Sequence, residues 1–174
     1  MSILVLGIGN ITMSDDAVGV RVVRRLRREY LFTPDLAIVE GGLSGLALLP
    51  LLEETERLLV VDAIDDKAAP GTLIRLSGDN LPIQFQHKLS SSQSGVPDLL
   101  AAAELLGFLP RETVVWGVQP AMMDFGFSFS PAVEASFEIL LEKVLHELSR
   151  WGVTATEAAT STVFTHGFLT IPVA

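Results

Sequence analysis

A short, uninterrupted apolar run near the start of the chain constrains the fold more than any other feature. Residues 3–6 are all apolar, and they lead directly into the turn Gly7-Ile8-Gly9-Asn10. A run this short and continuous is typical of a strand that is buried on both faces, as in a parallel sheet. From Val18 onward, apolar residues recur at helical spacing, and arginines fill the opposite face. Residues 1–30 therefore predict a strand, a glycine turn and a helix.

Alternating strand and helix patterns continue along the chain and indicate an α/β fold. Further strands are expected at residues 36–39, 58–61, 72–76 and 113–118, and helices at 43–52 (interrupted at Pro50), 97–106 and 131–150. This alternation predicts a three-layer fold, in which a twisted, mostly parallel five-stranded sheet has helices on both faces. The shortness of the strand at 72–76 suggests a sheet edge. We expect one domain over residues 1–150 and a C-terminal tail, 151–174, of unassigned role.

Composition and charge exclude several classes of protein. The chain has 174 residues, a formal net charge of −9 and no cysteine. The negative charge argues against nucleic acid or an anionic membrane surface as a partner, and the lack of cysteine excludes disulfides and thiolate metal sites. The arginines of the first helix are expected to form a solvated face. With no targeting or membrane-spanning segment visible, we expect a soluble, cytoplasmic protein.

Carboxylates stand at the carboxyl ends of two predicted strands. Asp16 lies where the first helix begins, and Asp62 directly follows the strand at 58–61. Ligands of open parallel sheets bind outside the carboxyl ends of the strands, where the strand order reverses. If the order is second, first, third strand, these two carboxylates converge. Each Asp alone is explained by a helix cap or a loop anchor, but a converging pair repels itself unless a cation lies between, which favours a divalent metal site.

Two other kinds of site fit the residues less well. Gly7 and Gly9 begin a dinucleotide fingerprint, but Thr12 stands where the third glycine is required, and acidic residues at the helix start would repel a pyrophosphate. The serines at 90–92 lack the pattern of a hydrolase nucleophile. The three histidines, His87, His146 and His166, are expected in a surface loop, on a helix face and in the tail. No catalytic residue is predicted.

Taken together, these residues resemble the maturation endopeptidases of nickel–iron hydrogenases. The resemblance runs in order over roughly residues 2–148 and rests on several short stretches. They are Gly7-Ile8-Gly9-Asn10, Asp15-Asp16-Ala17-Val18-Gly19-Val20, Glu40-Gly41-Gly42, Asp62-Ala63, residues 90–95, Gly117-Val118-Gln119-Pro120 and Ser130-Pro131-Ala132-Val133-Glu134.

The resemblance implies an endopeptidase that removes the C-terminal peptide of a hydrogenase large-subunit precursor once nickel is in place. It also implies that Asp16, Asp62 and a histidine from a later loop bind this nickel. The nickel is expected to be carried by the substrate, and another divalent metal is the alternative. Many members of the family carry Glu at the first position, so Asp16, one methylene shorter, would draw the metal closer to the backbone.

The loop that should supply the histidine departs from the family pattern. Aligned on Gln93 and Gly95, this chain has Ser92 at the ligand position. A neutral hydroxyl is a much poorer ligand than imidazole for nickel or zinc. His87 is the nearest histidine, five residues earlier, and would substitute only if the loop refolded. Three alternatives stay open: a weakened site, a shell completed by His87 or water, or a member without activity.

A substrate-binding role is expected for Glu40, Gly41 and Gly42, and also for Ser92. The glycines at the end of the second strand would let a peptide backbone approach closely, although a plain tight turn explains them equally well. The expected partner is the hydrogenase large-subunit precursor. A competing class is a non-enzyme, a chaperone that binds this precursor and has lost proteolysis with its histidine.

An apolar group follows the last predicted strand and allows two interpretations. Its members, Met122, Met123, Phe125 and Phe127, form either a surface for a partner protein or part of the core.

Overall fold

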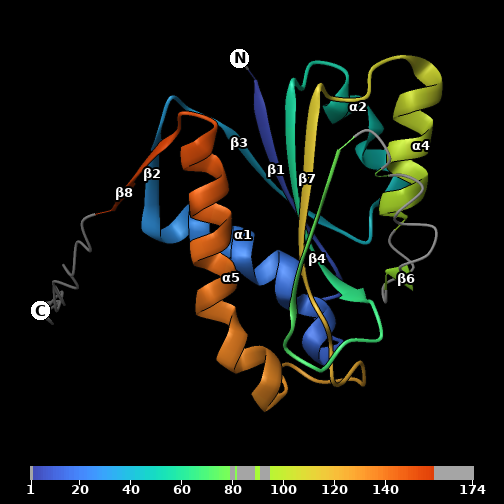
Figure 1. Cartoon of the computed structure of the whole chain (residues 1–174), viewed down its shortest axis with the longest axis vertical. Coiled ribbons are helices and arrows are strands. Elements are labelled where there is room, and N and C mark those ends of the chain that lie inside the picture. The colour runs from blue at the N-terminus through green and yellow to red at the C-terminus, as the bar shows by residue number, and fades with distance from the viewer. Residues whose placement is uncertain (1, 79–80, 82–88, 91–94, 159–174) are drawn as a thin grey trace, which may run out of the picture.

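The computed structural model describes residues 2–78, 81, 89–90 and 95–158. Its strands are β1 (Ile3–Ile8), β2 (Tyr30–Thr33), β3 (Ala37–Gly42), β4 (Arg57–Asp65), β5 (Leu73–Ser77), β6 (Leu89–Ser90), β7 (Glu112–Val118) and β8 (Thr154–Glu157). The main sheet has the order β3-β1-β4-β7-β5, and β6 pairs with the end of β4 (Figure 1). Strands β3, β1, β4 and β7 run parallel, whereas β5 is antiparallel to β7.

Helices cover both faces of this sheet. They are η1 (Ser14–Ala17), α1 (Val18–Glu29), η2 (Gly45–Leu48), α2 (Leu49–Leu52), α4 (Val96–Leu106) and α5 (Pro131–Arg150). Figure 1 shows α1 and α5 on one face and α2 and α4 on the other. Among the described residues, no helix combines the length and the apolar character needed to cross a membrane. The three-layer α/β fold predicted from the alternation of patterns is confirmed.

The first strand lies inside the sheet, as its continuous apolar run predicts. All six residues of β1 are buried, and they alternate between two hydrophobic clusters. Ile3 and Val5 pack into the cluster under α1 and α5, whereas Leu4 and Leu6 pack into the cluster under α2 and α4. Burial on both faces removes the polar alternation that a half-exposed strand would need.

The strand order that the sequence analysis took as its condition is the one observed, with β3 and β4 on either side of β1. The strand expected at an edge, now β5, also lies at an edge. The prediction that the third strand stops at Asp62 is wrong, because β4 continues to Asp65. Ala63 still pairs with Val118 of β7, and the last two residues of β4 pair with β6. Gly117 of β7 leaves room for the side chain of Ile64. Asp62 therefore lies within a strand rather than after it.

The helices differ from the sequence pattern mainly at the second one. Residues 43–52 form the short 3₁₀ helix η2 followed by a single turn, α2, with Pro50 in its first turn. The long last helix begins as predicted, with Ser130 accepting a hydrogen bond from the N–H of Val133 at 3.4 Å. The arginine face of α1 forms surface ion pairs. Arg24 and Arg27 pair with Glu40, and Arg25 pairs with Glu29 and Glu138.

Part of the C-terminal segment packs against the domain. Strand β8 pairs antiparallel with β2, and this two-stranded sheet lies beside the main one. Trp151 and Val153 are buried in the cluster under α1 and α5. Sequence patterns assign no structure to 151–158 because this pairing partner is more than a hundred residues away in the chain. Residues 159–174 lie outside the described part.

Candidate metal and substrate site

Asp16 is buried at the carboxyl edge of the sheet with one oxygen in use. It belongs to η1, directly before α1, and is only 2% exposed. Its Oδ2 accepts a hydrogen bond from the N–H of Asn10 at 2.8 Å. Its Oδ1 is buried and has no hydrogen-bond partner among the described residues. An acceptor left in this state is destabilising unless something binds it, so Oδ1 is a ready ligand for a cation.

The electrostatics of Asp16 point the same way. Burial raises its pKa, and the hydrogen bond from the backbone of Asn10 opposes that shift without cancelling it. No arginine or lysine forms an ion pair with this carboxylate in the described part of the chain. A bound divalent cation would supply the missing positive charge.

Glycines bring Asp16 close to the sheet. A Cβ on Gly19 would lie 2.1 Å from the carbonyl oxygen of Val61 and 2.3 Å from that of Ile8. A Cβ on Gly7 would lie 2.3 Å from the carbonyl oxygen of Gly19. Because real side chains do not fit at such distances, only glycine lets α1 lie directly on β1 and β4. The start of this helix, with Asp16, is thereby held over the ends of both strands.

Asp62 lies on β4, the strand beside β1, near the same edge. It directly follows Val61, which is in register with Gly7 of β1. Its side chain is fully buried, and its Oδ1 accepts a hydrogen bond from the N–H of Ala63 at 2.8 Å. Both predicted ligands are thus buried carboxylates, Asp62 within β4 and Asp16 in η1, which follows β1. That they share a metal stays a prediction.

The described residues supply no complete metal cage. Within the part of the chain that the structure describes, no cluster of three or more His, Cys, Asp or Glu side chains is placed to hold a metal. Ser92 and His87, the alternatives for a third ligand, lie outside the described residues, as does His166. His146 lies exposed on α5, as predicted, and takes no part in this site. A metal here would need further ligands beyond Asp16 and Asp62.

A groove adjoins Asp16 at the ends of β1 and β3. It has a volume of about 350 Å³, and Asn10, the residue that donates to Asp16, is part of its wall. The wall also contains the predicted substrate-binding residues Glu40, Gly41 and Gly42. The edges of the two strands are joined by a 3.1 Å hydrogen bond from the N–H of Gly9 to the carbonyl of Gly42.

Each of the three predicted groove residues has a different structural role. Glu40 forms ion pairs with Arg24 at 2.9 Å and with Arg27 at 3.6 Å. Gly41 is required by packing, since a Cβ would lie 2.6 Å from Cδ1 of Ile8. Gly42 has a φ of +52°, which favours glycine, but the space beside it is open. Gly42 is therefore the position from which a side chain would enter the groove.

Asp15 is a residue whose role the sequence analysis missed. A helix cap is the usual role for an Asp at this position, but no side chain caps η1. Instead, the fully buried carboxylate of Asp15 accepts hydrogen bonds from the residues that follow β7. Its donors are the N–H groups of Ala121 (2.9 Å), Met122 (2.9 Å) and Ser130 (2.7 Å) and the hydroxyl of Ser130 (2.8 Å). The pairing of acidic residues at 15 and 16 gives no sign of this long-range contact.

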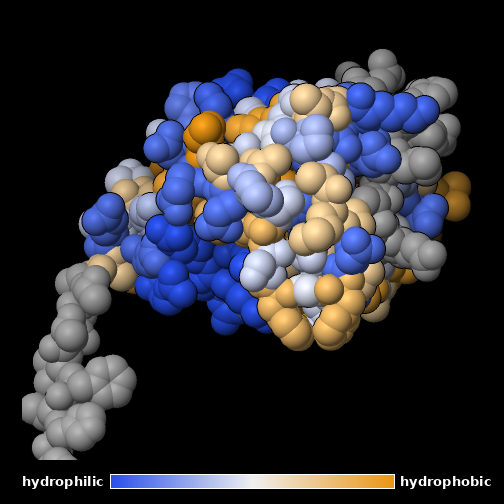
Figure 2. Space-filling model, turned by 90° about the horizontal axis from the view of Figure 1, so that it is seen from below, coloured by the Kyte–Doolittle hydropathy of each residue, from blue (hydrophilic) through white to orange (hydrophobic). Residues whose placement is uncertain are grey.

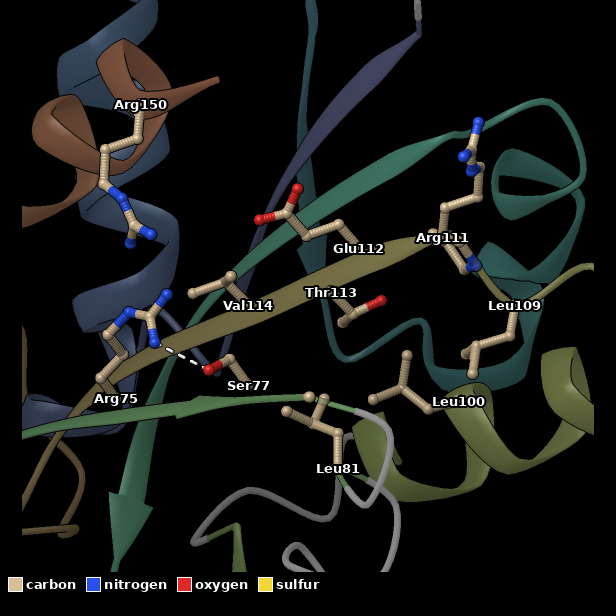
Figure 3. Close-up of a pocket in the computed structure, with 12 residues that line it drawn as sticks. Arg75, Ser77, Leu81, Leu100, Leu109, Arg111, Glu112, Thr113, Val114 and Arg150 are labelled. Carbon is tan, nitrogen blue, oxygen red and sulfur yellow. Dashed lines mark hydrogen bonds between the residues drawn. The ribbon is translucent and has the colours of Figure 1, made fainter.

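A larger cavity of about 420 Å³ lies at the other end of the sheet, where β7 begins and β5 ends. Figure 3 shows Arg75 and Arg150 pointing toward one another at one end of this cavity and Leu81, Leu100 and Leu109 at the other. Both arginines bind Glu147. The cavity is remote from Asp16 because β7 enters the sheet here and ends at the opposite edge.

Comparisons with known proteins find relatives that match most of this chain. Residues 20–147 match the family model of the HycI hydrogenase maturation protease. The Hydrogenase 2 maturation protease of Escherichia coli strain K12 is 38% identical over 156 residues, covering 89% of this chain and 95% of the relative. HupD of Rhodobacter capsulatus, a hydrogenase expression/formation protein, is 38% identical over 160 residues, covering 91% of this chain and 76% of the relative.

Solved structures show the same likeness. The hydrogenase maturating endopeptidase HybD from E. coli has a TM-score of 0.84 and 38% identity, covering 92% of this chain and 100% of the other. A [NiFe] hydrogenase maturation protease HybD from Thermococcus kodakarensis has a TM-score of 0.67 and 27% identity, covering 85% and 99%. With a family model that spans most of its length and relatives this similar, the chain belongs to the hydrogenase maturation protease family.

Proposed function

We propose that this protein is an endopeptidase that removes the C-terminal peptide from the large-subunit precursor of a nickel–iron hydrogenase after nickel insertion. Nickel, or another divalent metal in its place, belongs to the substrate in this proposal. The observation that carries it is the buried Oδ1 of Asp16, which has no hydrogen-bond partner among the described residues, together with the buried carboxylate of Asp62 on β4. Two carboxylates are acceptable ligands for such a metal, whose charge would relieve the cost of burying them.

The chain's own residues would orient the substrate rather than attack it. Asp16, held by the N–H of Asn10, presents Oδ1 to the metal, and Asp62 binds it from β4. The groove along Gly9, Gly41 and Gly42 accepts the peptide beside the scissile bond. A bound metal would polarise the carbonyl group or a water. Membership of the family supports this assignment, since the relatives are named as hydrogenase maturation proteases.

Cleavage of a purified, nickel-loaded precursor tests the proposal. Asp16→Asn and Asp62→Asn should each lower kcat/KM about 100-fold or more, because a metal–carboxylate interaction contributes several kcal/mol. Asp35→Asn is the matched control, since Asp35 is exposed between β2 and β3. It should cleave at the wild-type rate. Full activity in both site variants would refute the metal-binding role.

A precursor-binding chaperone is the second candidate. It is favoured by the lack of a third metal-binding side chain near Asp16 and Asp62 in the described part of the chain, together with Ser92 at the family's histidine position. The same assay separates the two functions. Precursor that binds without any change in its mass would favour the chaperone, and a shortened precursor would establish the endopeptidase.

A further inference from the structure

Four apolar side chains stand exposed beside the Asp16 site. Phe125 is 76% exposed and Phe127 62%, and their rings meet edge to face with centroids 5.6 Å apart. Ile11 (41%) and Met122 (38%) complete this group, which we call the aromatic rim. Met123 is half-buried and is not part of it. Figure 2 views the molecule from this end and shows a patch of apolar surface (orange) next to hydrophilic surface (blue).

The loop that carries the rim is fastened along its length to the turn that carries Asp16. The N–H of Ser14 donates to the carbonyl of Gly126 at 2.9 Å, and the N–H of Gly126 donates to Thr12 at 2.9 Å. The hydroxyl of Ser14 donates to the carbonyl of Asp124 at 2.9 Å. Gly126 permits this approach, since a Cβ there would lie 2.7 Å from Oγ of Ser14.

Further contacts secure both ends of the loop. The carboxylate of Asp15 binds its start, at Ala121 and Met122, and its end, at Ser130. Arg21 of α1 donates to the carbonyl of Phe127, and its guanidinium lies 4.5 Å from the ring centroid of Phe129. The exposed phenylalanines therefore project from an ordered backbone. Ordered aromatic side chains bind partners at low entropic cost and are enriched at protein interfaces.

The rim continues into the site. Ile11 belongs both to the rim and to the wall of the 350 Å³ groove, next to Asn10, which binds Asp16. Asp15, which holds the rim loop, directly precedes Asp16 in η1. A protein chain seated in the groove with its metal at Asp16 would therefore cover the rim as well.

We propose that the aromatic rim is the docking surface for an apolar segment of the hydrogenase large-subunit precursor, and that Asp15 is the positioning residue that aligns the rim with Asp16. This inference rests on the proposed function, since it takes the same precursor as partner. The rim is continuous with the groove that would hold the precursor, and this favours the precursor over a second copy of this chain as the partner. Docking at the rim raises the affinity for the precursor, whereas Asp16 and Asp62 bind the metal that positions the bond to be cleaved.

The first experiment measures two quantities on nickel-loaded precursor: Kd by calorimetry and steady-state cleavage. The double variant Phe125→Ser, Phe127→Ser should raise Kd and KM about tenfold, as expected for an aromatic hot spot, and change kcat less than twofold. Leu105→Ser is the matched control, because Leu105 is 87% exposed on α4, distant from the rim. It should leave both quantities unchanged. Unchanged Kd and KM in the double variant would overturn the proposal.

A second experiment isolates Asp15. Asp15→Asn places an amide N–H₂ where one oxygen now accepts hydrogen bonds, so it should release the loop and raise KM and Kd about as much as the double variant. Combined with the phenylalanine changes, Asp15→Asn should add less than twofold. Fully additive effects on Kd would mean that Asp15 does not act through the rim. The double variant alone decides the docking proposal if Asp15→Asn does not fold.

The two proposals fail in different ways. A wild-type protein that binds the precursor tightly but never cleaves it contradicts the proposed proteolysis, while the Kd comparison still tests the rim. Sedimentation of the protein alone tests whether a second copy of this chain, rather than the precursor, covers the rim. Dimers that dissociate in the phenylalanine double variant, with an unchanged Kd for the precursor, would assign the rim to self-association and overturn docking.

Discussion

Two buried carboxylates, at opposite ends of the sheet, differ in the number of hydrogen-bond and charge partners that surround them. Glu147 on α5 is 1% exposed and accepts hydrogen bonds from Arg75 at 2.9 and 3.0 Å, from Trp116 at 3.2 Å and from Arg150 at 2.9 Å. Asp16, equally buried, has one backbone N–H and an oxygen without a partner among the described residues.

The pKa values of the two groups move in opposite directions. Burial acts to raise the pKa of Glu147, but hydrogen bonds and charges from Arg75, Trp116 and Arg150 together outweigh it and lower that pKa. Burial dominates at Asp16 and raises its pKa. The carboxylate of Glu147, whose hydrogen bonds are satisfied, joins α5 to β5 and β7. The carboxylate of Asp16, which has an oxygen without a partner among the described residues, is available to a ligand. Perturbed and incompletely paired groups are typical of functional sites.

Removing the charge of Glu147 should mainly lower stability, whereas removing the charge of Asp16 should mainly lower cleavage activity. Glu147→Ala should lower the free energy of unfolding by about 2–4 kcal/mol, because it leaves the partly buried guanidinium of Arg75 without its partner. Its cleavage rate should stay near wild type at a temperature where it remains folded. Asp16→Asn should keep its midpoint of urea unfolding while losing cleavage. Comparable loss of stability in both variants would remove the distinction.

Acid should reveal the contribution of Glu147. Its pKa is lower in the folded protein than the ordinary 4.5, so the stabilisation it provides is fully present above about pH 4.5. That stabilisation is lost as the pH falls through the folded pKa. The charged groups around it are Arg75 on β5 and Arg150 on α5, with Glu112 near Arg75.

Urea unfolding of wild type and Glu147→Gln at a series of pH values measures this effect. The difference in unfolding free energy should be constant near neutral pH and shrink below about pH 4.5. A difference that stays constant through the acid range would show that the charge of Glu147 is not what stabilises the fold.

The smallest expected effect concerns the groove beside Asp16. Gly42→Asn suits the φ of +52°, because asparagine tolerates the left-handed region better than other residues with a side chain. The new side chain should enter the groove and raise the KM for the precursor about threefold, roughly the effect of a single modest clash. Gly78→Asn, at φ +103° and with open space around it, is the control at the opposite end of the sheet. Equal KM values would favour a plain turn at Gly42.

Much of the fold is visible in local patterns. The continuous run at 3–6 predicts a strand buried on both faces. The order β3-β1-β4 is compatible with the crossover rules, which leave the side on which β4 lies open. Errors occur where a distant strand decides the outcome. Pairing with β7 and then with β6 carries β4 beyond Asp62, and pairing with β2 makes a strand of Thr154–Glu157.

In the candidate site, too, some residues are predictable from local patterns and others depend on distant contacts. Asp16 follows β1, and Asp62 and residues 40–42 lie in the last parts of the neighbouring strands β4 and β3, so the sequence predicts the edge of the sheet at which they lie. Asp15 is not, because its donors lie more than a hundred residues further along the chain. Ser92 and its role as a third ligand stay a prediction, since it falls outside the described residues.

By itself, the sequence determined the layers of this protein, because hydrophobic periodicity is a property of neighbouring residues. It placed both carboxylates at one sheet edge only on the condition of a strand order that the fold supplies. The tertiary structure alone decided which buried acids are satisfied. Hydrogen bonds to Asp15 and Glu147 come from segments distant in sequence, whereas Oδ1 of Asp16 has no such partner among the described residues. A buried oxygen's free energy depends on which donors the complete fold brings within about 3 Å, and no local pattern contains that information.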